Sequence, residues 1–302
     1  MERGQIDVDT LPGGFDLQST VESGQSYLWW RADGDDYDGT YGGEGWYLTT
    51  TRATGEPAVV RVRQHEGHLE WESNADAGSV LVRRLRLDDD LVHIRERSPT
   101  DAVIDAAYDT YWGMRIVRDP PFGSLISFIC SAQMRVSRIH AMQQSLRAAF
   151  GTPIEFDGET YHAYPTPEQL AAATEAQLRE LSLGYRAPYV QRTAEMVAEG
   201  ERPAEATEHP YEEAREWLTR YVGVGDKVAD CVLLFSLGYL EAVPLDTWMQ
   251  TVIEEYYPDC DRGSYAPTSR ALRDRLGGEY AGYTQTYLFH YLRNRQSATD
   301  GE

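Results

Sequence analysis

The chain of 302 residues contains 49 acidic and 28 basic residues, so its formal net charge is −21. A chain of this length can bury a substantial core, and two or three closely packed units are expected. The sequence has no apolar run of about 18 residues, which excludes a membrane-spanning helix. The N-terminal residues lack the basic and apolar regions of a signal peptide, so we expect a cytoplasmic protein.

The three cysteines, Cys130, Cys231 and Cys260, are widely spaced along the chain. Scattered thiols in odd number fit a reducing compartment better than a disulfide framework. They are too few for a four-cysteine iron–sulfur cluster, and no Cys/His spacing indicates a zinc site. We therefore expect that no cofactor is required.

The N-terminal third predicts an antiparallel sheet with one solvated face. Residues 1–14 are polar and glycine-rich and are expected to form a loose arm. Short runs rich in Val, Thr, Tyr and Trp then alternate with acidic, glycine-bearing turns, which is typical of strands joined by hairpins. These runs are residues 26–31, 45–51, 58–63 and 68–73. The three aspartates at 88–90 predict a solvated turn or a helix start rather than a metal site.

From residue 91 onward the sequence predicts helices. Residues 91–111 have a helical pattern, and Pro121 is suited to open a buried helix after the break at 119–122. Apolar residues recur at three- and four-residue steps between Val136 and Ala149, which predicts an amphipathic helix. We predict an α+β protein with an N-terminal antiparallel β domain in residues 1–100 and helical domains in residues 101–302.

A helical hairpin is predicted at about residues 211–240. A polar, amphipathic run precedes Gly223-Val224-Gly225, and an apolar run follows it, so the turn is short enough to join two helices directly. Glycines permit backbone angles that other residues avoid and allow another backbone to approach closely. The second helix begins with free N–H groups and a positive dipole end, which suit a phosphate.

Lys227, in the first turn of that second helix, is the only lysine of the chain, whereas arginine occurs 27 times. An amine can lose its proton and attack carbon, which a guanidinium cannot do. Asp246 follows 19 residues later, after Pro244, and its position predicts the N-cap of the next helix. Taken singly, the lysine could be a chance surface residue and the aspartate an ordinary cap.

Five segments, in this order, resemble the helix-hairpin-helix DNA glycosylase superfamily, and within it 8-oxoguanine DNA glycosylases of the eukaryotic type. The segments are Ser-Gly-Gln-Ser-Tyr at 23–27, Leu-Ile-Ser-Phe-Ile-Cys-Ser at 125–131, Leu-Gly-Tyr-Arg-Ala at 183–187, Lys-Val-Ala-Asp-Cys at 227–231, and Ala-Gly-Tyr-Thr-Gln at 281–285 followed by Leu288 and Phe289. The similarity extends from about Asp16 to Arg295.

The resemblance implies a bifunctional DNA glycosylase and abasic-site lyase. Lys227 matches the nucleophile that attacks C1′ and forms a Schiff base with the opened sugar. Asp246 matches the carboxylate that stabilises the developing charge on the sugar or accepts the proton of the lysine.

The resemblance also implies a pocket for a base rotated out of the duplex. Phe289 and Cys231 match the residues that sandwich the base, and Gln285 matches the residue that reads its Watson–Crick edge. Gly24 matches the glycine whose carbonyl accepts the N7–H that 8-oxoguanine has and guanine lacks. Without the resemblance these residues would be read as core packing, a buried thiol, a surface amide and a turn glycine.

Contacts with the rest of the DNA are implied in the same way. Gln133 takes the place of a family asparagine that fills the gap left by the base. Arg138 and Arg186 match the arginines that hold the estranged cytosine, and Tyr185 matches a wedge at the neighbouring step. The amides around Gly223, Gly225 and Val228 match a phosphate grip, and the main-chain carbonyls of Thr219, Tyr221 and Val224 match a site for K⁺ or Na⁺.

The sequence departs from the family pattern at two places. The asparagine run after the first buried helix is replaced by Gln133-Met134-Arg135, which leaves the preferred opposite base undecided. The usual histidine two residues after the aspartate is Trp248, which alters contacts near the sugar phosphate.

The expected partner is double-stranded DNA that contains oxidised guanine, bound by a monomer without membrane contact. The acidic excess resembles that of proteins from the salt-loaded cytoplasm of halophilic archaea. In molar salt the screening length falls to about 3 Å, so distant like charges barely repel DNA. Measuring duplex binding against KCl concentration tests this hypothesis. Two alternatives remain open: a related glycosylase for alkylated purines or mismatches, and a non-catalytic DNA-binding hairpin module.

Overall fold

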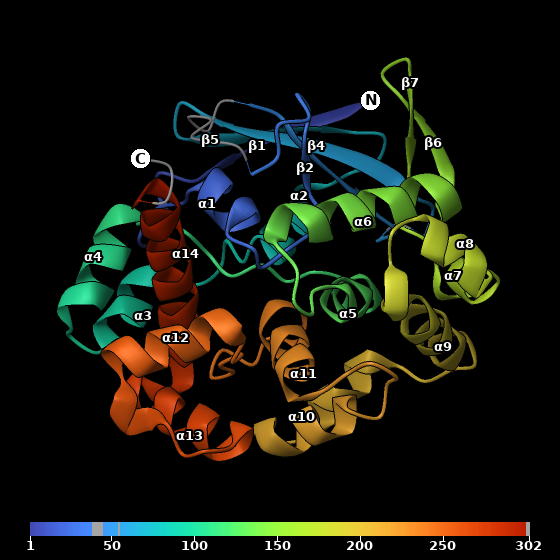
Figure 1. Cartoon of the computed structure of the whole chain (residues 1–302). Coiled ribbons are helices and arrows are strands. Elements are labelled where there is room, and N and C mark those ends of the chain that lie inside the picture. Colours follow the sequence, from blue (N-terminus) through green and yellow to red (C-terminus); the bar gives the residue numbers. More distant parts are fainter. Residues whose placement is uncertain (38–44, 54, 300–302) are drawn as a thin grey trace.

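The computed structural model describes residues 1–37, 45–53 and 55–299. It confirms the α+β architecture, with an antiparallel sheet above a group of helices (Figure 1). The sheet has the strand order β1-β5-β4-β3-β2. Its strands are β1 (Glu2–Asp7), β2 (Trp30–Arg31), β3 (Tyr47–Thr51), β4 (Ala58–His65) and β5 (His68–Ser73).

The expectation of a loose N-terminal arm is wrong, because residues 2–7 form the edge strand β1. This strand pairs along its whole length with β5, from Glu2 opposite Ser73 to Asp7 opposite His68. Gly4 lies against the indole of Trp71, where an added Cβ would come within 2.6 Å of a ring atom. A polar, glycine-containing segment can therefore form a strand when the neighbouring strand supplies the hydrogen bonds and a glycine allows close packing.

The sheet is covered more extensively than predicted. One face packs against α1 (Leu17–Glu22) and α2 (Gly78–Arg84) through a core that includes Leu17, Leu69 and Leu81. On the other face, Leu48 and Val59 contact a hairpin of β6 (Pro153–Phe156) and β7 (Glu159–His162), which the sequence did not indicate. The prediction of one fully solvated face is therefore wrong at the end of the sheet that this hairpin covers.

The predicted helix at 91–111 is broken into α3 (Leu91–Arg97) and α4 (Ala102–Thr110). The break contains Pro99, and each helix starts at an aspartate that accepts a backbone N–H, Asp90 for α3 and Asp101 for α4. Asp90 thus acts as the predicted helix start.

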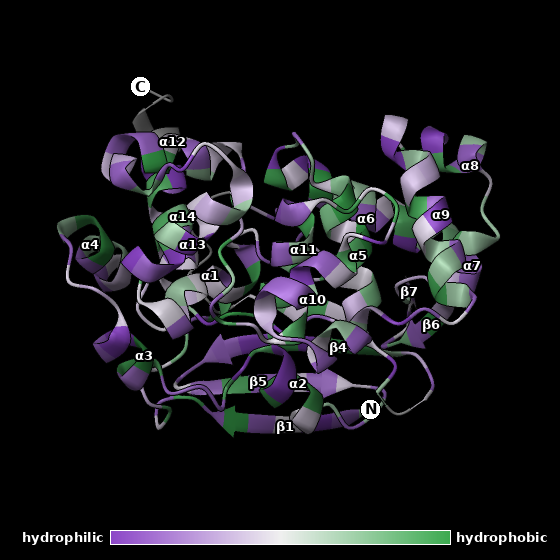
Figure 2. Cartoon of the chain, turned by 90° about the horizontal axis from the view of Figure 1, so that it is seen from below, coloured by the Kyte–Doolittle hydropathy of each residue, from purple (hydrophilic) through white to green (hydrophobic). Residues whose placement is uncertain are grey.

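The remaining helices form the rest of the helical part. They are α5 (Pro121–Cys130), α6 (Val136–Phe150), α7 (Pro167–Ala171), α8 (Glu175–Glu180), α9 (Ala187–Ala198), α10 (Tyr211–Leu218), α11 (Asp226–Val232), α12 (Thr247–Tyr256), α13 (Tyr265–Arg275) and α14 (Ala281–Thr299). Of these, α5 packs against α6, α9 and α11 and is buried at every residue from Gly123 to Cys130. Hydrophilic and hydrophobic residues are mixed along most of the other helices (Figure 2), as expected of amphipathic elements. Among the described residues, no helix is both long and apolar enough to cross a membrane.

The predicted hairpin is formed by α10 and α11, which contact each other across the turn at 219–225. Gly223 has a φ of +85°, and Gly225 is the N-cap of α11. After Val232 the helix continues as a π-helical segment, Leu233–Leu237, and ends at Gly238 with a φ of +88°. This arrangement places Lys227 in the first turn of α11, which packs against α5.

Candidate active site

A single pocket contains all six residues predicted for catalysis or base contact. Its walls come from the turn after α1, from α5, α6, α11 and α14, and from the start of α12, and it holds about 620 Å³ of empty space, part of it open to solvent. The predicted residues that line it are Gly24, Lys227, Cys231, Asp246, Gln285 and Phe289. The lining combines apolar and aromatic side chains with a few polar groups, which is typical of a pocket that binds a small organic group.

Lys227 is held at the pocket wall by a serine that the sequence did not single out. Its Nζ donates to Ser131 Oγ over 2.8 Å, and the Ser131 hydroxyl donates in turn to the carbonyl of Phe128 over 2.7 Å. The hydroxyl proton thus points toward the carbonyl, and an oxygen lone pair faces the amine. The amine also lies 5.7 Å from the centroid of the Phe128 ring. Ser131 therefore orients Lys227 within the pocket.

Asp246 is the N-cap of α12, as predicted. Its Oδ1 accepts the backbone N–H of Met249 over 2.7 Å. This bond fixes the rotamer of the side chain and leaves the carboxylate at the edge of the same pocket as Lys227.

A buried polar cluster connects α11 to the turn that carries Asp246. Asp230 accepts one hydrogen bond from Tyr211 and one from Tyr265, each of 2.8 Å, and lies 3.6 Å from a guanidinium nitrogen of Arg215. The Tyr265 hydroxyl also accepts the N–H of Leu245 over 3.1 Å. Burial raises the pKa of Asp230 to about 7. The cluster ties the helix of Lys227 to the residue directly before Asp246.

Gly24 forms the opposite wall and has a φ of +94°, a conformation that side chains rarely adopt. The turn is anchored by Gln25, which is buried and donates to the carbonyls of Thr20 and Arg115, each over 2.8 Å. Its Oε1 accepts the N–H of Val117 over 2.8 Å. The Gln25 side chain therefore holds the Gly24 turn in place through its NH₂ group and through its oxygen.

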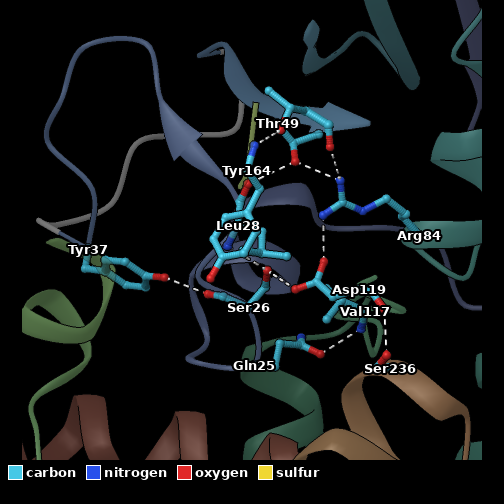
Figure 3. A network of polar contacts seen from close by, with 11 residues as sticks. Gln25, Ser26, Leu28, Tyr37, Thr49, Arg84, Val117, Asp119, Tyr164 and Ser236 are labelled. Atoms are coloured by element: carbon cyan, nitrogen blue, oxygen red, sulfur yellow. Dashed lines mark hydrogen bonds and ion pairs between the residues drawn. The ribbon is translucent and has the colours of Figure 1, made fainter. Parts of the chain in front are cut away.

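A second polar network anchors the segment that follows this turn (Figure 3). Arg84 and Asp119 form a buried ion pair of 2.7 Å, and Ser26 donates to the second oxygen of Asp119. Arg84 also donates to Thr49 of β3, and Ser236 from the π-helical segment after α11 donates to the carbonyl of Asp119 over 2.7 Å. The network thus connects the sheet, the Gly24 side of the pocket and the end of the hairpin helix.

Two further base-contact residues, Gln285 and Cys231, offer the pocket a polar amide and a neutral thiol. Gln285 is buried, and its Oε1 has no hydrogen-bond partner among the described residues, whereas its Nε2 lies 3.5 Å from the carbonyl of Pro244. An unpaired buried amide oxygen is costly, so a bound group that donates to it would be favoured. Burial raises the pKa of Cys231 to about 12, so its side chain is a neutral thiol at neutral pH.

Phe289 lies one turn after Gln285 on α14, which explains why both face the pocket. Trp248 packs edge-on against its ring, with the centroids 5.2 Å apart. The residue that departs from the family pattern therefore supports the aromatic wall in this protein.

Four of the predicted DNA-contact residues lie outside the pocket lining, near the turn between α5 and α6. Gln133 is exposed with a φ of +54°, and Arg138 and Tyr185 are exposed as well. Arg186 is buried, donates to the carbonyl of Ala132 and stacks against Tyr185 at 4.3 Å. In the free protein Arg186 therefore supports the turn that carries Gln133.

The two hairpin glycines have different local roles. A Cβ on Gly223 would come within 2.8 Å of Tyr189, and its φ is positive, so the fold itself requires glycine there. Gly225 has a φ of −103°, and a Cβ there would meet open space. Among the described residues no steric contact requires glycine at 225, although glycine is a favoured N-cap residue.

No ligand set for a multivalent metal is found within the described part of the chain, where no three His, Cys, Asp or Glu side chains come together. At the hairpin, the Tyr221 carbonyl accepts the N–H of Val224 over 3.1 Å, and the Tyr221 hydroxyl is buried without a described partner.

Comparison with known proteins agrees with this geometry. Residues 126–277 match the HhH-GPD superfamily base excision DNA repair protein, and residues 8–125 match the 8-oxoguanine DNA glycosylase N-terminal domain. An N-glycosylase/DNA lyase of Saccharomyces cerevisiae is 35% identical over 268 residues, covering 80% of this chain and 68% of the yeast protein. A probable N-glycosylase/DNA lyase of Methanothermobacter thermautotrophicus is 30% identical, covering 93% and 94% of the two chains.

The fold is also that of a solved enzyme. The structure of the Clostridium acetobutylicum 8-oxoguanine glycosylase/lyase, bound to double-stranded DNA with cytosine opposite 8-oxoG, superposes with a TM-score of 0.80. It shares 27% identity and 93% coverage of each chain. The hairpin, the lysine and the carboxylate at one pocket define a base-excision DNA glycosylase. The chain belongs to the HhH-GPD superfamily and carries the N-terminal domain of 8-oxoguanine DNA glycosylases.

Proposed function

We propose that this protein is a bifunctional DNA glycosylase and abasic-site lyase that removes 8-oxoguanine from duplex DNA. The observation that carries this proposal is the pocket itself, in which Lys227 and Asp246 meet the base-contact residues Gly24, Cys231, Gln285 and Phe289. The names of the relatives, which include both glycosylase and lyase, support the same pair of activities.

The lysine performs the covalent chemistry in this proposal. The neutral Lys227 amine forms a bond with C1′, the bond between C1′ and the base breaks, and the base leaves with the bonding electrons and takes up a proton. The aminal nitrogen then gives a proton to the ring oxygen O4′ as the C1′–O4′ bond breaks, which leaves a Schiff base between Lys227 and C1′. Loss of a C2′ proton to a base such as water then forms the C2′–C3′ double bond and releases the 3′ phosphate oxygen by β-elimination. Asp246 stabilises the positive charge that develops on the sugar, or accepts the proton of the amine.

The pocket recognises the base by stacking and by hydrogen bonds. Phe289 and the Cys231 thiol contact its faces, and the Gln285 amide reads its Watson–Crick edge. The Gly24 carbonyl accepts the N7–H of 8-oxoguanine, whereas guanine would present a second acceptor to it.

The DNA contacts follow the family pattern. Gln133 fills the gap in the duplex, Arg138 and Arg186 hold the estranged cytosine, and Tyr185 acts as a wedge. Amides at Gly223, Gly225 and Val228 bind a phosphate, and the carbonyls of Thr219, Tyr221 and Val224 surround K⁺ or Na⁺.

The enzyme divides near residue 100 into its β and helical domains and acts as a monomer on cytoplasmic, nucleoid-associated DNA. Its acidic surface is suited to high salt.

The test is strand cleavage of duplexes that differ only in one base: 8-oxoguanine, guanine, uracil or hypoxanthine. We expect cleavage of the 8-oxoguanine duplex alone. Cleavage of the hypoxanthine or uracil duplex at an equal rate would favour a related glycosylase. A protein that binds all four duplexes, cleaves none and leaves no alkali-labile abasic site would be the non-catalytic module. The related glycosylases that lack a lyase step are disfavoured by Lys227, because they use the aspartate and need no amine nucleophile.

The phosphate contact proposed for the hairpin amides gives a separate prediction. We expect Gly225→Ala to keep thermal stability close to that of the wild type, because alanine adopts a φ of −103° without strain, which offsets the loss of a favoured N-cap residue. Binding to a duplex that contains a tetrahydrofuran abasic analogue should weaken about tenfold, because the new methyl group fills the space that a phosphate needs, at a loss of about one hydrogen bond.

Gly223→Ala is the structural comparison and, unlike Gly225→Ala, should lose thermal stability. Its positive φ and the close approach of Tyr189 predict a lowered melting temperature. Unchanged duplex binding by Gly225→Ala would show that the backbone at 225 does not approach the DNA.

A further inference from the structure

Arg293 of α14 contacts both the Gly24 turn and the aromatic wall of the pocket. We infer that Arg293 is a specificity-determining residue, which holds the Gly24 carbonyl and the Phe289 ring in a fixed relation to each other. This inference rests on the proposed function, because that function assigns base recognition to Gly24 and Phe289.

The first contact is with the main chain directly before Gly24. Arg293 Nη1 donates to the carbonyl of Ser23 over 3.2 Å, and Nη2 makes a longer contact of 3.5 Å with the carbonyl of Glu22. The Ser23 carbonyl belongs to the same peptide plane as the Gly24 N–H. Arg293 thus fixes the peptide plane before Gly24, and Gln25 anchors the residue after it. Gly24 therefore keeps little backbone freedom, although glycine has more of it than any other residue.

The guanidinium also packs against Gly24 itself. A Cβ built on Gly24 would lie 3.0 Å from Arg293 Nη1. The absence of a side chain at 24 thus lets the cation approach the backbone of the turn.

The second contact is with the stacking surface. The Arg293 guanidinium carbon lies 5.1 Å from the centroid of the Phe289 ring, one turn earlier on the same helix. A cation at this distance from an aromatic ring is attracted to it. With Trp248 at the ring edge, Arg293 limits rotation of the Phe289 side chain.

His290, the residue after Phe289 on α14, also contacts the Arg293 guanidinium. Its Nδ1 lies 3.2 Å from Arg293 Nη2, and burial together with Arg293 lowers the pKa of His290 to about 3. The imidazole is therefore neutral and can accept from the guanidinium, so the positive charge at this wall is that of the arginine.

These contacts bear on selectivity because 8-oxoguanine and guanine differ, at N7, by a single donor. A carbonyl discriminates a donor from an acceptor only where its position is fixed at hydrogen-bond distance. If the turn or the ring can shift, guanine is no longer penalised by an unavoidable contact between two acceptors. Loss of Arg293 should therefore reduce discrimination more than it reduces attachment to DNA.

The experiment compares Arg293→Met with the wild type. Methionine keeps much of the length and packing and removes the charge and the donors. We expect single-turnover excision of 8-oxoguanine to slow about tenfold, the equivalent of one hydrogen bond, and any slow excision of guanine not to slow with it, so that the ratio of the two rates falls. Affinity for a duplex with a tetrahydrofuran abasic analogue, which has no base to contact Gly24 or Phe289, should stay within about twofold.

Arg295→Met is the charge control, because Arg295 is exposed on the same helix and its loss removes an equal charge. It should leave both measurements unchanged. Arg293→Lys restores the charge and part of the donors and should recover part of the excision rate. It also serves as the test variant if methionine prevents folding, with a smaller loss in excision expected and the same unchanged abasic binding.

Equal losses in 8-oxoguanine excision and abasic-duplex binding would overturn the inference, since they would indicate a general structural role. Excision at the wild-type rate in Arg293→Met would overturn it as well. Failure of the proposed function looks different, because the wild type itself would then not excise 8-oxoguanine.

Discussion

Replacement of Lys227 by glutamine is expected to abolish strand cleavage while leaving lesion binding within a few-fold of the wild type. The glutamine amide is close to lysine in length and can still donate to Ser131 Oγ, so the pocket wall is preserved. It has no basic lone pair and cannot form a covalent bond to C1′. Loss of a covalent nucleophile should cost at least about 10³-fold in rate.

Borohydride reduction provides the measurement. The wild type should give a covalent adduct with an 8-oxoguanine duplex, and Lys227→Gln should give none. Since the sequence contains no other lysine, the adduct has one side-chain candidate. Trapping of the glutamine variant at the wild-type yield would show that another amine is the nucleophile.

Much of the site could be predicted from local sequence because its signals are local. The Gly-x-Gly turn, the N-cap at Asp246 and the one-turn separation of Gln285 and Phe289 each depend on residues close in the chain. Asp246, Gln285 and Phe289 line one pocket together with Lys227, whereas the Gly-x-Gly turn lies outside its lining.

The residues that orient these groups were not predictable in this way. Ser131 meets Lys227 across 96 positions, and Arg293 meets Ser23 across 270. Asp230 lies next to Cys231 within a recognised motif, but its partners Tyr211 and Tyr265 come from other helices. A single sequence gives no signal for such pairs, because each member alone resembles an ordinary polar residue.

The errors in the fold have a similar origin. β1 is polar, and the hairpin of β6 and β7 is short and alternates Pro153 and Glu155 with Ile154 and Phe156. Neither has the run of β-branched residues that indicates a strand. Both form because an existing surface, β5 or the outer face of β3 and β4, offers hydrogen bonds or apolar contacts.

Asp246→Asn is expected to separate the chemistry of this residue from its structural role. Asparagine is as good an N-cap as aspartate, so the bond to the Met249 N–H and the thermal stability should be retained. The negative charge is lost, and excision of 8-oxoguanine should slow by about 10²- to 10⁴-fold. Asp246→Ala is the matched control and should lose the cap as well, at a further cost of about 1 kcal/mol in stability.

A second substrate distinguishes the two roles proposed for the carboxylate. A preformed abasic site already has an aldehyde, so Schiff-base formation on it involves no oxocarbenium-like sugar. If Asp246 acts by stabilising that sugar, Asp246→Asn should cleave abasic DNA at a rate close to the wild type. If Asp246 accepts the proton of Lys227, both reactions should slow together. Excision of 8-oxoguanine within about threefold of the wild-type rate, a difference of under about 1 kcal/mol in barrier, would exclude both roles.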